Sequence, residues 1–178
     1  MEPLETLEDF YDRKLNQKRE GLNTVLGHFN VFRLEDCNAP GKPPVQYTRR
    51  DFYKISFMRG RHLYHYGDKT LEVDGTTLLF FNPQVPYTFE PLTEDVTGYF
   101  CIFKDAFFAE HLRGSLKDLP MYAVNGKPAY VLDQQQLTGF PDVAEVKVVA
   151  GDSVDILTAF IRVILPRIIQ MGSTLYMG

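Results

Sequence analysis

Regularly spaced turn signals between Tyr47 and Phe103 constrain the fold of this 178-residue chain more than any other feature. Short runs of aromatic and β-branched residues fill the intervals between them, and turns about 8–12 residues apart are typical of an all-β sandwich or small barrel. The four turn signals are Arg59-Gly60, Gly67-Asp68, Asp74-Gly75 and Asn82-Pro83. We therefore expect this stretch to form a β-core around which the rest of the chain packs.

Hydrophobic periodicity predicts further elements on both sides of this core. Apolar residues recur at helical spacing between Leu4 and Lys18, and Thr6 followed by Asp9 is a typical capping pair at the start of a helix. The helical stripe comprises Leu4, Leu7, Phe10, Tyr11 and Leu15. Alternating patterns predict strands over residues 29–34, 53–58, 62–66, 70–73, 77–81, 87–89, 98–103, 129–132 and 143–149.

Two more helices are expected toward the C-terminus. Asp105 is placed to cap a helix over residues 106–112, and apolar residues recur at helical spacing from Val154 to Met171, with Pro166 expected to kink or end that helix. Its apolar stripe can form a seam between two copies of the chain. The alternative is that the stripe only covers the β-core, as most such stripes do. The residues expected to make the dimer seam are Leu157, Ile161 and Ile164.

Charge and hydropathy argue against several functions. The formal net charge is −4 and no cluster of Lys and Arg stands out, so nucleic-acid binding by these residues is disfavoured. The acidic start MEPLETLEDF lacks the pattern of a secretory signal peptide, which favours a cytoplasmic location where Cys37 and Cys101 stay reduced. The most apolar run, residues 156–171, contains two arginines and a proline. It is too short and too charged to predict a membrane span.

Sequence motifs of zinc, nucleophile and phosphate chemistry are not found. The two cysteines form no CxxC or CxxH pair, and neither GxSxG nor GxxxxGK occurs. Cys101 lies in an aromatic strand, where a buried, inert thiol is the ordinary outcome. The sequence therefore points to no reaction, and we expect the protein not to be an enzyme.

Six consecutive segments carry a resemblance to a known family. They are RRDFYKI at residues 49–55, MRG at 58–60, YGDKTLEVDGTTLLFF at 66–81, NPQVPYTF at 82–89, GYFCIF at 98–103 and DAFFAEHL at 105–112. Between Phe10 and Phe140 their order and spacing resemble the N-terminal sensor and dimerisation domain of AraC-type bacterial transcription regulators. The resemblance implies a mainly β, cupin-like double-stranded β-helix, or jelly-roll barrel, with an N-terminal helix and C-terminal helices.

The resemblance also implies a function and partners. Such a domain senses a small-molecule effector, forms a homodimer, and reaches DNA only through a C-terminal pair of helix-turn-helix units. No such pair is recognisable after Leu132, and residues 141–178 depart from the family pattern. We expect an N-terminal helical arm at residues 1–28, the cupin-like β-barrel at residues 29–132, and a C-terminal packing or dimerisation segment at residues 133–178.

Metal binding in the manner of cupin enzymes is not expected, and no cofactor is predicted. His62 and His65 are three residues apart on an expected strand, which directs them to opposite faces. Metal cupins hold Fe, Mn or Ni with two histidines and a glutamate on the entry strand and a later histidine. The resemblance puts non-ligands or poor ligands at these four positions, which are Thr48, Arg50, Lys54 and Tyr87.

The same four positions are expected to line a small-ligand site. If cupin geometry holds, Thr48, Arg50 and Lys54 point into the barrel toward Tyr87. The two cations suit a carboxylate or phosphate on the ligand. Aromatic rings that could stack on a sugar or aromatic ligand come from Tyr64, Tyr66 and Tyr99.

A solvated face is the alternative for the two cations. Arg50 and Lys54 would then pair with nearby acidic residues, and the more apolar opposite face of their strand would be the core. The acidic candidates are Asp51, Glu72 and Glu90, and the apolar residues are Tyr53, Ile55 and Phe57.

Two further functions stay open beside the sensor. A metal-independent cupin enzyme, such as a sugar isomerase or epimerase, would use His65, Tyr87 or Tyr99 as acid or base. A dimerisation module with a filled barrel would bind no ligand. Turnover of a sugar separates the enzyme from the sensor, and a packed interior without a cavity favours the plain module.

Overall fold

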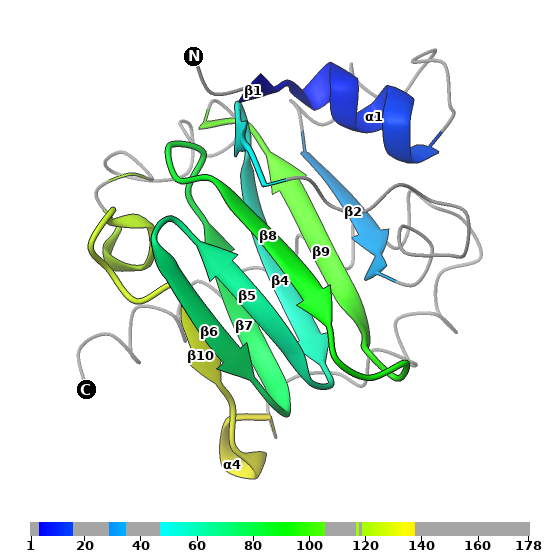
Figure 1. Ribbon diagram of the computed structural model, residues 1–178, viewed down its shortest axis with the longest axis vertical. Helices are drawn as coiled ribbons and strands as arrows, with labels where there is room; N and C mark the ends of the chain where they lie inside the picture. The colour runs from blue at the N-terminus through cyan, green and yellow to red at the C-terminus, as the bar shows by residue number, and fades with distance from the viewer. Residues whose placement is uncertain (1–3, 16–28, 35–46, 106–116, 118, 138–178) are drawn as a thin grey trace.

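The computed structural model describes residues 4–15, 29–34, 47–105, 117 and 119–137. Six of its strands follow one another along the stretch that the turn signals divide (Figure 1). They are β4 (Tyr53–Arg59), β5 (His62–Tyr66), β6 (Lys69–Val73), β7 (Thr76–Phe81), β8 (Tyr87–Pro91) and β9 (Thr97–Phe103). Each of the four turn signals lies at the junction of two consecutive strands, as predicted, and Arg59 is itself the last residue of β4.

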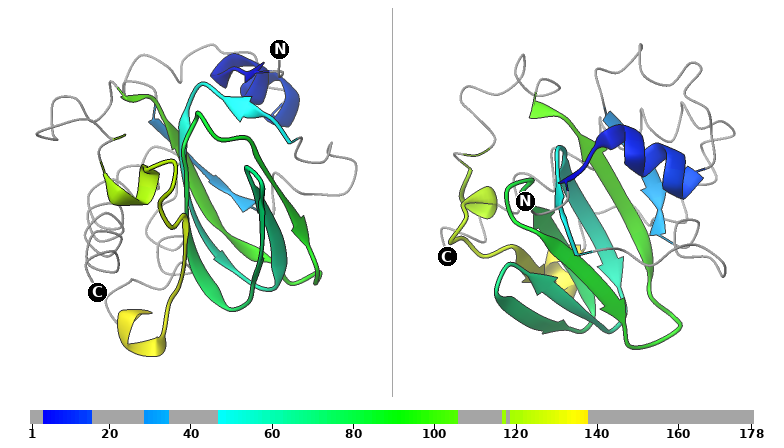
Figure 2. Two further views of the ribbon diagram at one scale, coloured as in Figure 1. Left: turned by 60° about the vertical axis from the view of Figure 1, so that its left-hand side comes forward. Right: turned by 45° about the horizontal axis from the view of Figure 1, so that its top comes forward.

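These strands are divided between two facing sheets (Figures 1 and 2). A five-stranded antiparallel sheet has the order β10-β7-β4-β9-β2, with β2 at Phe29–Arg33 and β10 at Ala129–Val131. A three-stranded antiparallel sheet has the order β6-β5-β8. The chain passes repeatedly from one sheet to the other, so sequence neighbours face each other across the interior. This mainly β arrangement confirms the predicted cupin-like fold.

Strand β4 is buried on both of its faces, which corrects the solvated-face alternative. Ile55 and Tyr53 are directed away from the three-stranded sheet, yet both are buried, because the ring of Tyr122 packs 5.1 Å from that of Tyr53. Tyr122 belongs to a short 3-10 turn, η2 (Pro120–Tyr122), that the sequence pattern did not predict. On the other face, Lys54 is only 7% exposed.

The N-terminal helix is confirmed, and it begins at the predicted Thr6–Asp9 capping pair without including Leu4 of the expected stripe. Helix α1 spans Leu7–Leu15, and Thr6 caps it through a 3.1 Å hydrogen bond from the Asp9 amide to Thr6 Oγ1. Leu4 was expected on the helical stripe, but it is 53% exposed. The reason is that Leu4–Glu5 forms strand β1, which pairs in parallel with β3 (Arg49–Arg50).

Helix α1 covers part of the inner face of the wider sheet. The ring of Phe10 lies 5.5 Å from Phe32 on β2, 6.1 Å from Phe100 on β9 and 5.7 Å from Phe52. The three-stranded sheet faces β7, β4 and β9, so the helix closes the side that it leaves open (Figure 2). This helix packs on the β-core as expected, and its residues Leu7, Phe10 and Tyr11 are buried in the interior cluster.

Several predictions fall outside the described residues. They are the helix over 106–112, the strand over 143–149, the C-terminal helix with Leu157, Ile161 and Ile164, and Cys37. Strand 129–132 is present as β10, and a short helix that was not predicted, α4, follows at Gln134–Leu137. Within the described part of the chain, no helix is long and apolar enough to cross a membrane.

Candidate functional site

Arg50 is held rigidly at one end of the barrel. Its guanidinium donates from Nε to Glu5 Oε2 at 2.8 Å and from Nη1 to the carbonyl oxygens of Thr48 and Tyr87 at 2.9 Å each. It also lies over the Tyr87 ring, 3.7 Å from the centroid. Both members of the ion pair with Glu5 are buried, with 3% and 4% of their side chains exposed. Arg50 therefore joins strand β8 to the N-terminal arm.

Glu5 is the ion-pair partner of Arg50, and sequence reasoning missed it. Its carboxylate also accepts from Arg13 of helix α1, so one buried carboxylate joins the arm, the helix and strand β3. Parallel pairing of Glu5 with Arg50 in β1 and β3 brings the two side chains together. No local signal connects positions that are 45 residues apart.

Lys54 lies between the two sheets, in a cage of aromatic rings. Its Nζ is 4.3 Å from the ring centroid of Phe100 and 5.0 Å from that of Phe81, both on the five-stranded sheet. It is 5.8 Å from the rings of Tyr87 and Phe89, which belong to β8 of the other sheet. Cations over ring faces are attracted by the ring quadrupole. The cage therefore holds a positive charge inside the barrel.

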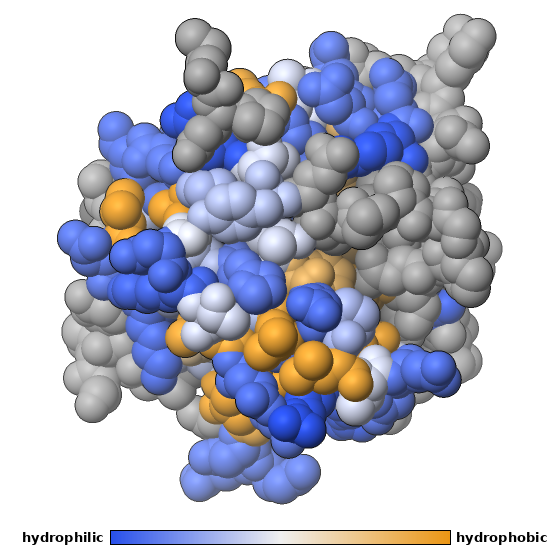
Figure 3. Space-filling model, in the orientation of Figure 1, coloured by the Kyte–Doolittle hydropathy of each residue, from blue (hydrophilic) through white to orange (hydrophobic). Residues whose placement is uncertain are grey.

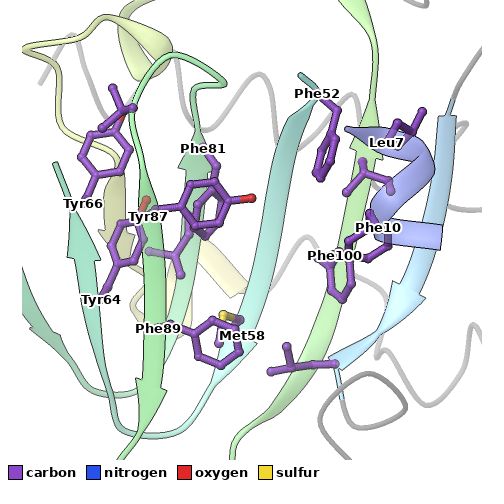
Figure 4. Packing of buried hydrophobic residues seen from close by; sticks show 14 of the residues in the cluster. Leu7, Phe10, Phe52, Met58, Tyr64, Tyr66, Phe81, Tyr87, Phe89 and Phe100 are labelled. Carbon is purple, nitrogen blue, oxygen red and sulfur yellow. The ribbon is translucent and has the colours of Figure 1, made fainter. Parts of the chain in front are cut away.

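The buried hydrophobic side chains of the interior form two groups (Figure 4). Phe81, Tyr87, Phe89 and Tyr64 lie together on one side, and Leu7, Phe10, Phe52 and Phe100 lie on the other, next to helix α1 (Figure 4). Because Lys54 contacts rings from both groups, it is placed between them. This is the position from which a charged group can interact with a molecule bound in the interior.

Three hydroxyl groups from residues that are completely buried face the same interior and lack hydrogen-bond partners among the described residues. They belong to Ser56, Tyr64 and Thr77, all with 0% exposure. Ser56 follows Lys54 on the same face of β4, and Thr77 on β7 stands opposite Met58. Tyr64 comes from β5 and packs 5.0 Å from Phe81. Buried polar groups are normally hydrogen-bonded. These three hydroxyl groups therefore give the interior unused capacity to donate and accept hydrogen bonds.

The buried tyrosines are arranged to stay neutral. Burial raises the pKa of Tyr64 well above its usual range, and it also raises the pKa of Tyr87, an effect that the nearby Arg50 guanidinium partly opposes. Burial raises the pKa of Tyr66 to about 12. Neutral phenols donate and accept hydrogen bonds but exchange protons reluctantly near neutral pH. These side chains therefore suit binding better than acid–base catalysis.

The candidate acid–base residues of the enzyme alternative lie in different places. Tyr87 points into the barrel, whereas His65 lies on the outer face of the same sheet and contacts Thr70 Oγ1 at 3.0 Å. Tyr99 is on the face of β9 opposite Phe100, and its hydroxyl is 3.4 Å from Arg33 Nε. No two of the three converge on one point.

The predicted site residues are only partly brought together. Thr48, Arg50, Lys54 and Tyr87 are all buried, and Thr48 forms a β-bridge with Tyr87. Tyr64 joins them through Phe81, whose ring lies 4.3 Å from that of Tyr87. Tyr99 is not part of this group. Ser56 and Thr77 were missed, although the parity of Ser56 with Lys54 on one strand could have indicated it.

The two histidines of β5 lie on opposite faces, as predicted. His62 is fully buried and its ring makes a T-shaped contact with that of Phe89, whereas the side chain of His65 is 31% exposed. Within the described residues, no group of three or more His, Cys, Asp or Glu side chains is arranged to hold a metal ion. Burial also raises the pKa of the Cys101 thiol to about 12, so this thiol stays protonated near neutral pH and is a poor nucleophile.

We expect His62 to make the protein less stable in mild acid. Burial lowers the pKa of His62 below its usual 6.5, and the nearby Gly60 backbone opposes this only in part. The unfolded chain therefore binds more protons below about pH 6.5, and the free energy of unfolding falls as the pH drops. Urea unfolding between pH 8 and 5.5 should show a smaller loss in His62→Phe. The half-exposed His65→Gln is the control, and parallel curves for wild type and His62→Phe would contradict the assignment.

The outer face of the three-stranded sheet has the character of a solvent-facing surface. His65, Thr70 and Glu90 line it, and the exposed pair Arg61 and Glu72 is joined by a 2.6 Å hydrogen bond. On the side drawn in Figure 3, small groups of hydrophobic residues lie among hydrophilic ones.

Comparison with known families agrees with this picture. The family model described as AraC-like ligand binding domain matches residues 43–143, more than half of the chain. The matched range contains the strands from β3 to β10, and therefore the whole three-stranded sheet and four of the five strands of the wider sheet. No curated protein matched the chain.

Proposed function

This chain belongs to the family of AraC-like ligand-binding domains, the ligand-sensing part of AraC-family regulators, and we propose that its effector binds between the two sheets of the barrel. The observation that carries the proposal is the convergence of a lysine, buried hydroxyls and aromatic rings on one interior. Ligand sites are typically apolar, with a few polar groups that set orientation. The residues proposed to contact the effector are Lys54, Tyr64 and Tyr87, with Thr48 and Arg50 at the end of the barrel.

The N-terminal arm provides a route from the ligand to a regulatory response. Tyr87 contacts Arg50, and Arg50 is paired with Glu5 of the arm. A ligand that binds better to one position of Tyr87 also favours one position of Arg50, and therefore of the arm. The ligand and the arm are then coupled through a difference in affinity between two arrangements of the barrel.

The regulatory output is proposed to require a second copy and a DNA-binding half. We infer a cytoplasmic bacterial homodimer joined through Leu157, Ile161 and Ile164, which acts on DNA through helix-turn-helix units attached to this domain. Sedimentation of the wild type and of Leu157→Asp tests the dimer. A wild type that sediments as a monomer at all concentrations would contradict it.

We expect an effector to raise the thermal midpoint of the purified chain. Ligand at 100 times its Kd stabilises by about 2.7 kcal/mol, which corresponds to a rise of roughly 5–10 °C for a chain of this size. Differential scanning fluorimetry against sugars, sugar acids and organic acids is the measurement. Amide chemical shifts should then change along β4, β5, β7 and β8. Shifts confined to residues outside these four strands, or no binding by any compound, would refute the proposal.

A further inference from the structure

We propose that the effector is a small polyhydroxylated acid of the sugar-acid class, whose anionic group binds the Lys54 ammonium and whose hydroxyl groups bind Ser56, Tyr64 and Thr77. This inference rests on the proposed function, because it names the chemistry of the molecule that occupies the barrel interior. It follows from the kinds of polar group that the two sheets direct toward each other.

The anionic group is inferred from the position of Lys54. Its Nζ lies among rings of both sheets, at 4.3 Å from Phe100 and 5.0 Å from Phe81, and the residue is 7% exposed. An ammonium has three donors, so it can bind a ligand while keeping its other contacts. A carboxylate would form a charge-assisted hydrogen bond in surroundings of low polarity, and such bonds are about twice as strong as neutral ones.

Arg50 is not the anion receptor of this site. Its Nε and Nη1 are directed to Glu5, Thr48 and Tyr87 at 2.8–2.9 Å, so its fork is engaged by the protein itself. Glu5 already supplies the carboxylate that a guanidinium prefers. We therefore assign the anionic group to Lys54, whose Nζ lies between the two sheets. Of the two cations expected to bind an anion, only Lys54 keeps that role in this proposal.

The hydroxyl groups are inferred from Ser56, Tyr64 and Thr77. Their oxygens are shielded from solvent and have no hydrogen-bond partner among the residues described. Each can donate one hydrogen bond and accept others, which matches the donor and acceptor character of a ligand hydroxyl. An acid without hydroxyl groups would bind Lys54 but leave these groups unmatched, and each unmatched polar group lowers affinity by about tenfold.

The spatial order of the groups fits one molecule. Lys54 and Ser56 are two positions apart on one face of β4, or roughly 7 Å along the strand. Thr77 on β7 is the diagonal neighbour of Ser56, because Met58 pairs with Thr77 and Ser56 pairs with Leu79. Tyr64 faces them from the other sheet, through its contact with Phe81. The flanking rings of Phe81 and Phe100 offer flat apolar surfaces for the carbon skeleton.

Isothermal titration of the purified chain with matched probes tests the inference. Gluconate and galacturonate carry both features, sorbitol and galactose lack the charge, and hexanoate lacks the hydroxyl groups. We expect at least one of the two acids to bind tenfold or more tightly than its neutral counterpart and than hexanoate. In Lys54→Met the advantage of the acid over its neutral counterpart should disappear. In Ser56→Ala and in Thr77→Val, the affinity of the acid relative to that of hexanoate should fall. The expected fall is up to about tenfold for each hydroxyl group removed.

Lys69→Met is the matched control, because it removes the same charge from the exposed strand β6 and should leave the affinity for the acid unchanged. Equal binding of an acid and its neutral counterpart would overturn the inference, as would unchanged affinity in Lys54→Met. The wild-type comparison needs no variant, so a Lys54→Met that fails to fold does not weaken the test. If galactose, sorbitol or hexanoate binds best, the ligand class is wrong but the sensor function stands. If no small molecule binds, both fail.

Discussion

Gly98→Ala is expected to lower the free energy of unfolding by roughly 3–5 kcal/mol, from backbone strain and overpacking together. Gly98 has φ near +148°, which L side chains rarely adopt, and it pairs with Met58 of β4. A Cβ on Gly98 would lie 2.1 Å from the carbonyl oxygen of Phe57 and 2.9 Å from Met58 Cα. Both are backbone atoms of β4 in the five-stranded sheet, so they cannot move aside as a flexible side chain could.

Gly75→Ala is the matched control for this prediction. Gly75 also has a positive φ, near +93°, but a Cβ there would meet only Val131 Cγ1 at 3.8 Å, an ordinary contact. The difference between the two variants in urea unfolding therefore isolates the clash with β4. Because natural domains are stable by only about 5–15 kcal/mol, Gly98→Ala is expected to be largely unfolded or poorly expressed. Equal stabilities of the two variants would show that β9 does not approach β4 as described.

Arg50→Met is expected to cost about 3–5 kcal/mol, because it leaves one member of a buried ion pair without its partner. The guanidinium also donates to two backbone carbonyls and lies over the Tyr87 ring, so its loss loosens β8 from β3. Arg13 still contacts the Glu5 carboxylate and reduces the loss in part. The measurement is urea unfolding at neutral pH, with limited proteolysis to follow release of the N-terminal arm.

A double-mutant cycle separates the ion pair from the packing around it. Buried ion pairs replaced together by apolar residues are often close to neutral in stability. Glu5→Leu combined with Arg50→Met should therefore recover much of the loss that each causes alone. Arg61→Met is the exposed control, because its pair with Glu72 has both side chains about half exposed and such pairs contribute about 0–1 kcal/mol. Losses of similar size for Arg50→Met and Arg61→Met would contradict the proposed role of Arg50.

Local pattern predicted the strands well, for a physical reason. In β5 the alternation of side chains between two faces, together with a glycine turn at each end, leaves few other conformations for the chain. Predicted and observed bounds of β5 agree at His62–Tyr66. The order of motifs along the chain also indicated the family, which the match over residues 43–143 shows.

Which face of β4 points to the core could not be decided from alternation. Its pattern left open whether Lys54 or Ile55 pointed to the core, because one-dimensional periodicity does not say how many layers cover a sheet. Here the three-stranded sheet covers one face, and Tyr122 lies against the other, so both residues are buried. Burial of a cation on such a strand depends on the rings that surround it, and these come from β7, β8 and β9.

The start of the chain illustrates the same limit. Helical spacing placed Leu4 on the apolar stripe of α1, and the Thr6 and Asp9 pair correctly located the helix start. What local pattern could not supply was the pairing of Leu4–Glu5 with Arg49–Arg50, which depends on residues about 45 positions away. Short-range periodicity and turn chemistry act within a few residues and so determined the elements of this protein. The partners of Glu5, Arg50 and Lys54 are chosen by contacts between distant segments, which exist only after the two sheets have closed.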